Sequence, residues 1–211
     1  MESPLRAGAG APGLQLIETA LWDGAACPRI DGHMARLTRS AALLGWPCDG
    51  GAARAALTGP AGTAARLRLT LDGAGRIAVT QAPLPPARAE WRLGLAEVRL
   101  ASGDPWLRIK TTRRAVYDKA RAALPEGRDE LVFLNERGEV CDGTITTLFF
   151  DRGQGLRTPP LASGLLAGVL RAELLASGAC AEEVLMADQL PRARLWVGNA
   201  LRGLITALWV G

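Results

Sequence analysis

Lys110 is the residue whose type and position most clearly suggest covalent chemistry. The chain has 25 basic residues, and only Lys110 and Lys119 are lysines, so arginine forms nearly all of its cationic surface. An arginine guanidinium does not lose its proton in a protein, whereas a lysine amine can do so and attack a carbonyl carbon. The run Trp106–Ile109 predicts a short apolar strand ending at Lys110, where partial burial would lower the lysine pKa. The alternative is a lysine that extends from a strand edge into water.

Asp142 begins a second candidate region, because it is followed by Gly143 and by the threonine-rich segment Thr144–Thr147. A carboxylate beside such a turn can pair with a protonated ring nitrogen while backbone N–H groups and hydroxyls bind a phosphate. The alternative is an ordinary Asp-Gly β-turn that leads into the next strand.

Two further segments could present backbone N–H groups to an anion. Leu165–Ala176 has the spacing of an amphipathic helix and follows Ser163-Gly164, so its start could bind an anion through unpaired amides and the helix dipole. Most helix starts bind nothing. Gly198-Asn199 predicts a turn near the end of the chain.

The sequence excludes several other kinds of site. His33 is the only histidine, and it begins an amphipathic helix, where packing or capping is commoner than catalysis. The cysteines form no C-x-x-C pair, so neither a metal site nor a disulfide framework is expected. We expect buried free thiols in a cytoplasmic protein instead. Acid–base chemistry must therefore come from Lys, Asp, Glu, Tyr or a cofactor.

The bulk composition, 48% apolar and 22% charged, is typical of a globular protein. The net charge of +4 is modest and the arginines are scattered, so nucleic acid is not an expected partner. No apolar run approaches the roughly 18 residues that would predict a membrane span. Residues 1–13 are rich in Gly, Ala and Pro and predict a flexible leader.

The expected class is α+β with two domains. Residues 14–82 predict a small α+β domain, 83–90 a proline-rich linker, and 91–211 a larger β-rich domain. In the small domain we expect a strand at 14–22, a return segment at 26–30, and a helix from His33 to Gly45. In the larger one we expect a helix at 112–124 and strands at 91–100, 131–135, 139–142, 144–151, 183–186, 194–197 and 204–209.

Five motifs in this order resemble one family. They are H-x-x-R-L at His33, K-T-T-x-R at Lys110, N-E-x-G-x-V-x-D-G-T-I-T at Asn135, T-P-P-L-x-x-G-L-L-x-G-V-x-R at Thr158 and G-N-x-L-R-G-L at Gly198. The pattern resembles the class IV aminotransferases, the fold-type IV enzymes that use pyridoxal 5′-phosphate (PLP). Within them it looks most like the 4-amino-4-deoxychorismate lyase-like branch. The resemblance implies a small α/β sandwich domain, a larger pseudo-barrel domain and a homodimer.

The resemblance also implies roles for single residues. Lys110 matches the lysine that bonds to the cofactor and moves the substrate α-proton, and Asp142 matches the acid that pairs with the pyridinium nitrogen. The residues that match phosphate- and cofactor-binding positions are Arg36 on the first helix, Ile145 and Thr146 in the turn (through backbone and hydroxyl), Val169 and Leu170 at the helix start, and Asn199 and Ala200 in the last loop. Thr19, Arg113 and Tyr117 are candidate substrate contacts.

The implied reaction is loss of pyruvate from aminodeoxychorismate to give p-aminobenzoate, a folate precursor. The alternatives are an amino-acid transaminase of branched-chain or D-amino-acid type, and a catalytically weakened PLP-binding homologue. Asp142 motivates the last alternative, because it is one methylene shorter than the glutamate usual in the family. Thr147 and Ala200 also replace more polar residues.

Overall fold

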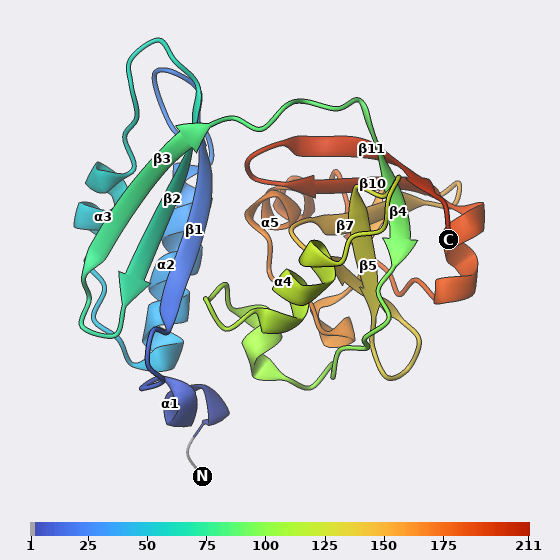
Figure 1. Cartoon of the computed structure of the whole chain (residues 1–211), viewed down its shortest axis with the longest axis horizontal. Coiled ribbons are helices and arrows are strands. Elements are labelled where there is room, and N and C mark those ends of the chain that lie inside the picture. Colours follow the sequence, from blue (N-terminus) through green and yellow to red (C-terminus); the bar gives the residue numbers. More distant parts are fainter. Residues whose placement is uncertain (1–2) are drawn as a thin grey trace. The chain divides into compact units, whose positions relative to one another are not determined.

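The computed structural model describes residues 3–211 and has mixed α and β structure (Figure 1). The described residues form two compact units. The first extends to Pro86 and also includes Ile109–Arg113, whereas the second consists of Ala87–Arg108 and Arg114–Gly211. The first unit is therefore not continuous in sequence, because Ile109–Arg113 belongs to it although the residues on either side belong to the second unit.

The first unit is a three-stranded antiparallel sheet, in the order β1-β2-β3, with α2 along it (Figure 1). Its elements are α1 (Pro4–Gly8), β1 (Gln15–Trp22), α2 (Ile30–Leu44), α3 (Gly50–Ala56), β2 (Ala65–Asp72) and β3 (Ile77–Pro83). Strand alternation determines which side of β2 is covered. Leu67, Leu69 and Leu71 are fully buried, while Arg66 and Arg68 between them are exposed.

Ile109–Arg113 lies beside β1 as an extra edge segment. The Ile17 N–H donates to the Lys110 carbonyl at 2.8 Å, the Thr112 N–H donates to the Gln15 carbonyl at 2.9 Å, and Thr111 forms an antiparallel bridge with Leu16. Backbone pairing with β1 therefore holds the backbone of Lys110.

The predicted strand before Lys110 is wrong. Pro105–Arg108 forms a 3-10 helix, η1, and the Trp106 N–H donates to the Asp104 carboxylate at 2.9 Å. Asp104 and Pro105 are favourable residues for such a tight turn, and they outweigh the apolar pattern of the run.

The second unit contains an eight-stranded sheet in the order β6-β5-β4-β11-β10-β7-β8-β9. Its remaining elements are β4 (Glu90–Leu95), α4 (Ala115–Ala122), β5 (Glu130–Leu134), β6 (Val140–Gly143), β7 (Thr147–Asp151), β8 (Arg157–Thr158), η2 (Leu161–Ser163), α5 (Val169–Ala176), β9 (Ala181–Glu182), η3 (Ala187–Arg192), β10 (Arg194–Asn199) and β11 (Gly203–Trp209). Three neighbouring pairs are parallel, namely β4/β11, β4/β5 and β8/β9.

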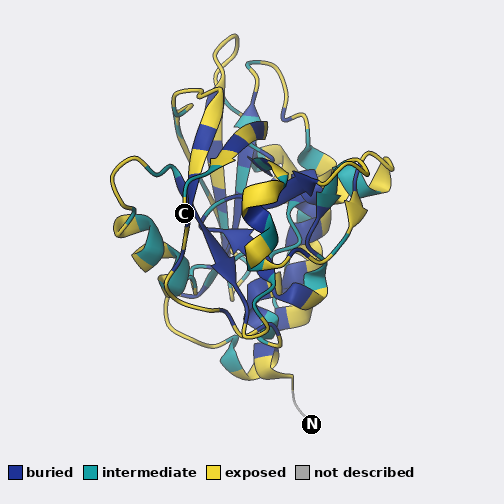
Figure 2. Cartoon of the chain, turned by 90° about the vertical axis from the view of Figure 1, so that its right-hand side faces the viewer, coloured by how far each residue is buried: buried dark blue, intermediate teal, exposed yellow. Residues whose placement is uncertain are grey.

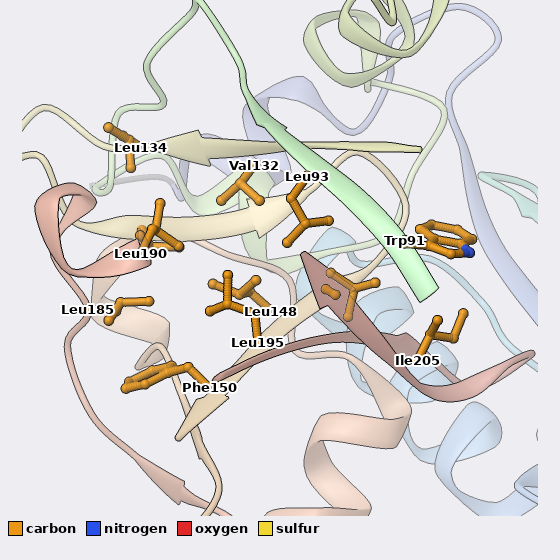
Figure 3. Packing of buried hydrophobic residues seen from close by; sticks show 13 residues of the cluster. Trp91, Leu93, Val132, Leu134, Leu148, Phe150, Leu185, Leu190, Leu195 and Ile205 are labelled. Carbon is orange, nitrogen blue, oxygen red and sulfur yellow. The ribbon is translucent and has the colours of Figure 1, made fainter. Parts of the chain in front are cut away.

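This sheet curls so that its two ends meet. The Val140 N–H at the β6 end donates to the Leu185 carbonyl at 2.8 Å, and Glu139 bridges to Met186 just after β9. The curled sheet encloses an apolar core, drawn in Figure 3, that includes Leu93, Val132, Leu148, Phe150 and Leu195. Strands β5 and β7 are buried along their whole lengths. Buried stretches of the chain are dark blue in Figure 2. This is the pseudo-barrel expected from the resemblance.

Several local predictions need correction. Pro4–Gly8 within the expected flexible leader forms helix α1, whose Leu5 is buried, while the prediction for Met1 and Glu2 lies outside the described residues. Residues 26–29 form no strand, and α2 begins at Ile30 rather than His33. The helix expected at 112–124 is α4, Ala115–Ala122, and the one expected at 165–176 begins only at Val169.

Two predicted strands also differ. The strand expected at 91–100 ends at Leu95, and only an isolated bridge from Leu100 to Asn135 continues it. The strand expected at 183–186 is displaced to β9, Ala181–Glu182. No helix in residues 3–211 combines the length and apolar character of a membrane-spanning segment.

Candidate active site

The end of β6 and the turn that follows it contain three of the predicted site residues, namely Asp142, Ile145 and Thr146. Asp142 lies one residue before the end of β6 and is 6% exposed. The Gly143 N–H donates to the Thr146 carbonyl at 2.7 Å, which closes a tight turn. A Cβ on Gly143 would lie 2.6 Å from Thr146 Oγ1 and 2.9 Å from Glu130 Oε2, so a larger residue would displace them. The turn has this shape only with glycine at its start.

Glu130, the first residue of β5, is a functional candidate that the sequence did not reveal. Its side chain is fully buried. The carboxylate accepts hydrogen bonds from the N–H groups of Leu131 (3.1 Å), Thr144 (3.0 Å) and Ile145 (3.2 Å), from Thr146 Oγ1 (2.8 Å) and from Thr144 Oγ1. The only sequence signal was an acid beside an apolar run, which is also typical of an exposed strand end.

Helix α5 begins beside this turn. Its N-cap, Gly168, has an extended backbone and no side chain with which to cap the helix. The Ala172 N–H donates to the Gly168 carbonyl at 2.9 Å, so the N–H groups of the first helical turn, Val169 and Leu170 among them, precede the first intrahelical bond. A Cβ on Gly168 would lie 2.9 Å from Thr147 Oγ1, so glycine allows the helix start to approach β7 closely.

The β10–β11 turn completes this group of segments. Asn199 Nδ2 donates to the Ile145 carbonyl at 3.2 Å, and Asn199 Oδ1 accepts from the N–H groups of Leu201 and Arg202 at 3.1 and 3.0 Å. A Cβ on Gly198 would lie 2.8 Å from Leu170 Cδ2. The structure thus brings Ile145, Leu170 and Asn199 together, and Ala200 is buried beside Asn199. The role of these residues in cofactor binding remains a prediction.

Asp142 also has a contact from the segment before α5. The Leu166 N–H donates to Asp142 Oδ2 at 3.3 Å. Burial is the main cause that raises the pKa of the Tyr117 hydroxyl on α4, and the charge of Asp142 raises it further. The hydroxyl therefore stays protonated at neutral pH. The Tyr117 ring meets Phe133 edge-on, with 5.1 Å between centroids. Within this unit, Tyr117 is therefore a neutral group in the electrostatic neighbourhood of Asp142.

In the first unit, Lys110 is half-buried and its backbone is paired with β1. Thr112 strengthens this pairing, because its hydroxyl accepts from the Gln15 N–H and donates to the Gly13 carbonyl, both at 3.0 Å. Thr19 is half-buried on β1, and Arg113 is exposed. The assignment of Thr19 and Arg113 as substrate contacts remains a prediction.

Arg36 on α2 is held by Glu18 on β1. Arg36 Nε donates to Glu18 Oε1 at 2.8 Å and its Nη2 donates to Oε2 at 2.5 Å, while His33 Nδ1 lies 2.6 Å from the same Oε2. All three residues are buried. Burial raises the pKa of Glu18, but the Arg36 guanidinium and the bonds from Arg36 and His33 lower it by more, to about 2. His33 is thus a buried packing partner, as its place on the helix indicated.

The residues present fit PLP. A phosphate needs N–H donors, and the close approaches at Gly168 and Gly198 bring β7 and the last turn against the start of α5, whose first N–H groups precede the first intrahelical bond. Among the other residues that the cofactor requires, the second unit contains the buried acid Asp142, whereas Lys110 and Arg36 belong to the first unit. One detail differs from expectation, because the Ile145 N–H and the Thr146 hydroxyl donate to Glu130.

Comparison with known proteins gives a consistent result. The family model described as "Amino-transferase class IV" matches residues 15–208. A candidate aminodeoxychorismate lyase of Schizosaccharomyces pombe is 31% identical over 177 residues, which cover 80% of this chain and 76% of that protein.

Solved structures are similar across almost the whole chain. A candidate amino-acid aminotransferase from Mesorhizobium loti is 46% identical, with a TM-score of 0.87, and the match covers 93% of this chain and all of that one. A hypothetical aminotransferase from Mycobacterium tuberculosis in its PLP-bound form shares the fold, with a TM-score of 0.78 at 23% identity, covering 95% of this chain and 82% of that one.

Proposed function

The chain belongs to the class IV aminotransferase family of PLP-dependent enzymes, and from this premise we propose that it is a 4-amino-4-deoxychorismate lyase. The observation that carries the proposal is the assembly of Asp142, the turn at Ile145, the start of α5 and Asn199 in one unit. The relative from Schizosaccharomyces pombe supports the choice of reaction.

Lys110 is proposed as the residue that bonds to the cofactor aldehyde. It is the chain's half-buried lysine, and its amine can hold or release a proton. In the lyase reaction the Lys110 amine would remove the proton from the ring carbon that bears the nitrogen. The ring C–O bond would then break, the departing enolpyruvate would gain a proton and become pyruvate, and the ring would become the aromatic ring of p-aminobenzoate.

Asp142 is proposed to hold a proton on the pyridine nitrogen. A carboxylate in this position keeps the nitrogen protonated, and the bound cofactor then supplies an electron sink for the bond that breaks. Asp142 is buried and already accepts one backbone N–H, so its carboxylate is oriented by the protein. The shorter side chain changes the distance to the ring nitrogen and leaves its charge the same.

An aminotransferase is the second candidate, and it is supported by the 46% identity to the candidate amino-acid aminotransferase of Mesorhizobium loti. In that reaction Lys110 would move the proton to the cofactor instead, water would supply the oxygen of the released keto acid, and the amino group would stay with the cofactor for the second substrate. The branched-chain and D-amino-acid types are both candidates. We propose a homodimer for either reaction, and a role in folate synthesis for the lyase.

The first experiment tests cofactor attachment. Purified protein with PLP should absorb visible light, and borohydride should fix the cofactor on Lys110, which peptide mass mapping would identify. Lys110→Ala should abolish this attachment, whereas Lys119→Ala, which changes the only other lysine and lies exposed on α4, should leave it intact. Absence of visible absorbance in the native protein with PLP would refute the proposal.

The second experiment separates the reactions. The loaded protein is incubated with aminodeoxychorismate, and pyruvate and p-aminobenzoate are measured; a parallel sample receives amino-acid and keto-acid pairs. Equal amounts of pyruvate and p-aminobenzoate support the lyase. Keto-acid formation alone supports the aminotransferase, and bound PLP without turnover on either set indicates the weakened homologue. Sedimentation velocity tests the proposed dimer.

A further inference from the structure

Glu130 carries a buried carboxyl group that the proposed chemistry does not use. It lies at the start of β5, and none of its side chain is exposed. It forms a long ion pair with Arg121, whose Nη1 is 3.5 Å from Oε1 and whose side chain is 36% exposed. Burying a carboxylate is costly unless its lone pairs are satisfied. Here neutral donors satisfy them, and four of the five come from Thr144, Ile145 and Thr146 of one turn.

The turn is also held through its carbonyl groups. Arg114 Nη2 donates to the Thr144 carbonyl at 2.9 Å, and Asn199 Nδ2 donates to the Ile145 carbonyl at 3.2 Å. Carbonyl oxygens would repel a phosphate, and these two are already engaged by donors. Glu130 accepts the Ile145 N–H, which belongs to the same peptide as the Thr144 carbonyl, so the protein holds both ends of that peptide.

The hydroxyl protons decide what the turn can offer an anion. A threonine hydroxyl has one proton to donate. In Thr144 and Thr146 that proton lies in the hydrogen bond to Glu130, so each hydroxyl presents only lone pairs elsewhere. Lone pairs do not stabilise a phosphate oxygen. In this arrangement neither hydroxyl is a phosphate donor, in contrast to the role that the family resemblance implies for Thr146.

We propose that Glu130 is a positioning residue for the cofactor phosphate. It accepts hydrogen bonds from the hydroxyls of Thr144 and Thr146 and so maintains the shape of the turn Gly143–Thr147. The phosphate is then bound by backbone N–H groups, including those at the start of α5. The requirement for glycine at position 143 agrees with this, because a Cβ there would collide with Thr146 Oγ1 and Glu130 Oε2 together. The inference rests on PLP as the cofactor.

The test compares PLP with pyridoxal, which lacks the phosphate but carries the same aldehyde. Dissociation constants for both are measured from visible absorbance in the wild type and in Glu130→Gln. The amide keeps the side chain's size but replaces one acceptor with a donor that opposes the Ile145 N–H. We expect roughly tenfold weaker binding of PLP and unchanged binding of pyridoxal, as for the loss of about one hydrogen bond.

Glu139→Gln is the matched control. Glu139 lies beside β6 at the opposite end of the β5–β6 hairpin, where it accepts from Asn135 and Ser163. It should leave the ratio of PLP to pyridoxal affinity unchanged. Equal weakening of both ligands in Glu130→Gln, or no weakening of either, would overturn the inference. Failure of the wild type to bind either ligand would instead overturn PLP as the cofactor.

Thr146→Val provides a second test that does not depend on the folding of a Glu130 variant. If the hydroxyl serves Glu130, its loss should weaken PLP binding by less than about threefold, with Thr146→Ser unchanged. If the hydroxyl donates directly to the phosphate, PLP binding should weaken tenfold or more. The second result would contradict the proposal that the Thr146 hydroxyl bonds Glu130 rather than the phosphate, even if Glu130→Gln behaved as expected.

Discussion

Two buried glutamates stabilise the two units in different ways. Glu18 in the first unit is paired with a charged guanidinium and with His33, and each of its oxygens accepts from Arg36. Glu130 in the second unit is surrounded by backbone N–H groups and hydroxyls, and its ion pair with Arg121 is long. Each glutamate is hydrogen-bonded to a part of the chain that is predicted to contact the cofactor phosphate. Glu18 bonds Arg36, and Glu130 bonds the turn at Ile145.

The difference shows two ways of solvating a buried carboxylate. An ion pair concentrates the stabilisation in one partner, so removal of either charge leaves the other charge buried and uncompensated. With neutral donors the stabilisation is shared among several hydrogen bonds of about 1 kcal/mol each, so the loss of one bond costs less free energy of unfolding. The first arrangement orients one side chain, whereas the second shapes a whole turn.

The largest expected effect is that of Glu18→Gln. It leaves the Arg36 charge buried without its carboxylate and should cost about 3–5 kcal/mol in the free energy of unfolding. Glu130→Gln loses neutral hydrogen bonds and should cost about 1–3 kcal/mol. Urea unfolding of both variants measures the difference. Equal losses would mean that the two carboxylates are held in the same way.

Acid should weaken the first arrangement in a defined pH range. The pKa of Glu18 is held at about 2, below its ordinary value of 4.5, so the folded protein binds this proton less tightly than the unfolded chain does. The resulting stability, on the order of 3 kcal/mol, is fully present above pH 4.5 and is lost as the pH falls toward 2.

The free energy of unfolding at about pH 5 and about pH 3 checks this expectation. The Glu18→Gln variant is the control, because it lacks the titrating group and should lose less stability between the two values. A variant with the same acid dependence as the wild type would assign the effect to other carboxyls.

A smaller effect is expected where the turn meets Glu130. Gly143→Ala forces Thr146 Oγ1 and Glu130 Oε2 apart and should cost about 1–3 kcal/mol, together with weaker PLP binding. Gly103→Ala is its control, because a Cβ there meets nothing within 4 Å, and its stability should change by less than about 0.5 kcal/mol. Thermal unfolding with and without PLP measures both.

The smallest effect is expected for an exposed ion pair. Arg76 bonds Asp72 at the β2–β3 turn, and the Arg76 side chain is 81% exposed. Water and salt screen such a pair. Arg76→Ala should therefore unfold at the same urea concentration as the wild type, within error. A loss comparable to that of Glu18→Gln would show that burial does not decide the strength of these pairs.

The sequence indicated candidate site residues in the second unit because the motif residues lie at strand ends, helix starts and turns. The structure places Asp142, Ile145, Leu170 and Asn199 at such positions, and their role in cofactor binding remains a prediction. Glu130 was missed because its role depends on strand register. Gly143 pairs with Val132 across the β5–β6 hairpin, and that pairing brings the turn over the carboxylate. No local pattern encodes this non-local contact.

Local misassignments have similar causes. Leu165 is fully buried, so its apolar spacing resembled a helix, but Gly164 has φ +89° and the helix begins only after Gly168. The membership of Ile109–Arg113 in the first unit was missed for another reason. It follows from pairing with β1, about ninety positions earlier in the chain, as the bond from Gln15 to Thr112 spans 97 residues.

The pairing of Ile109–Arg113 with β1 has a consequence for synthesis of the chain. A nascent chain or truncated fragment that stops at Pro86 has β1 as an unpaired sheet edge, and exposed edges recruit other strands. Such a fragment should aggregate, and extending it through Arg113 would supply the missing edge partner. Lys110, the proposed catalytic lysine, lies within the segment that covers this edge, so both are synthesised at the same time.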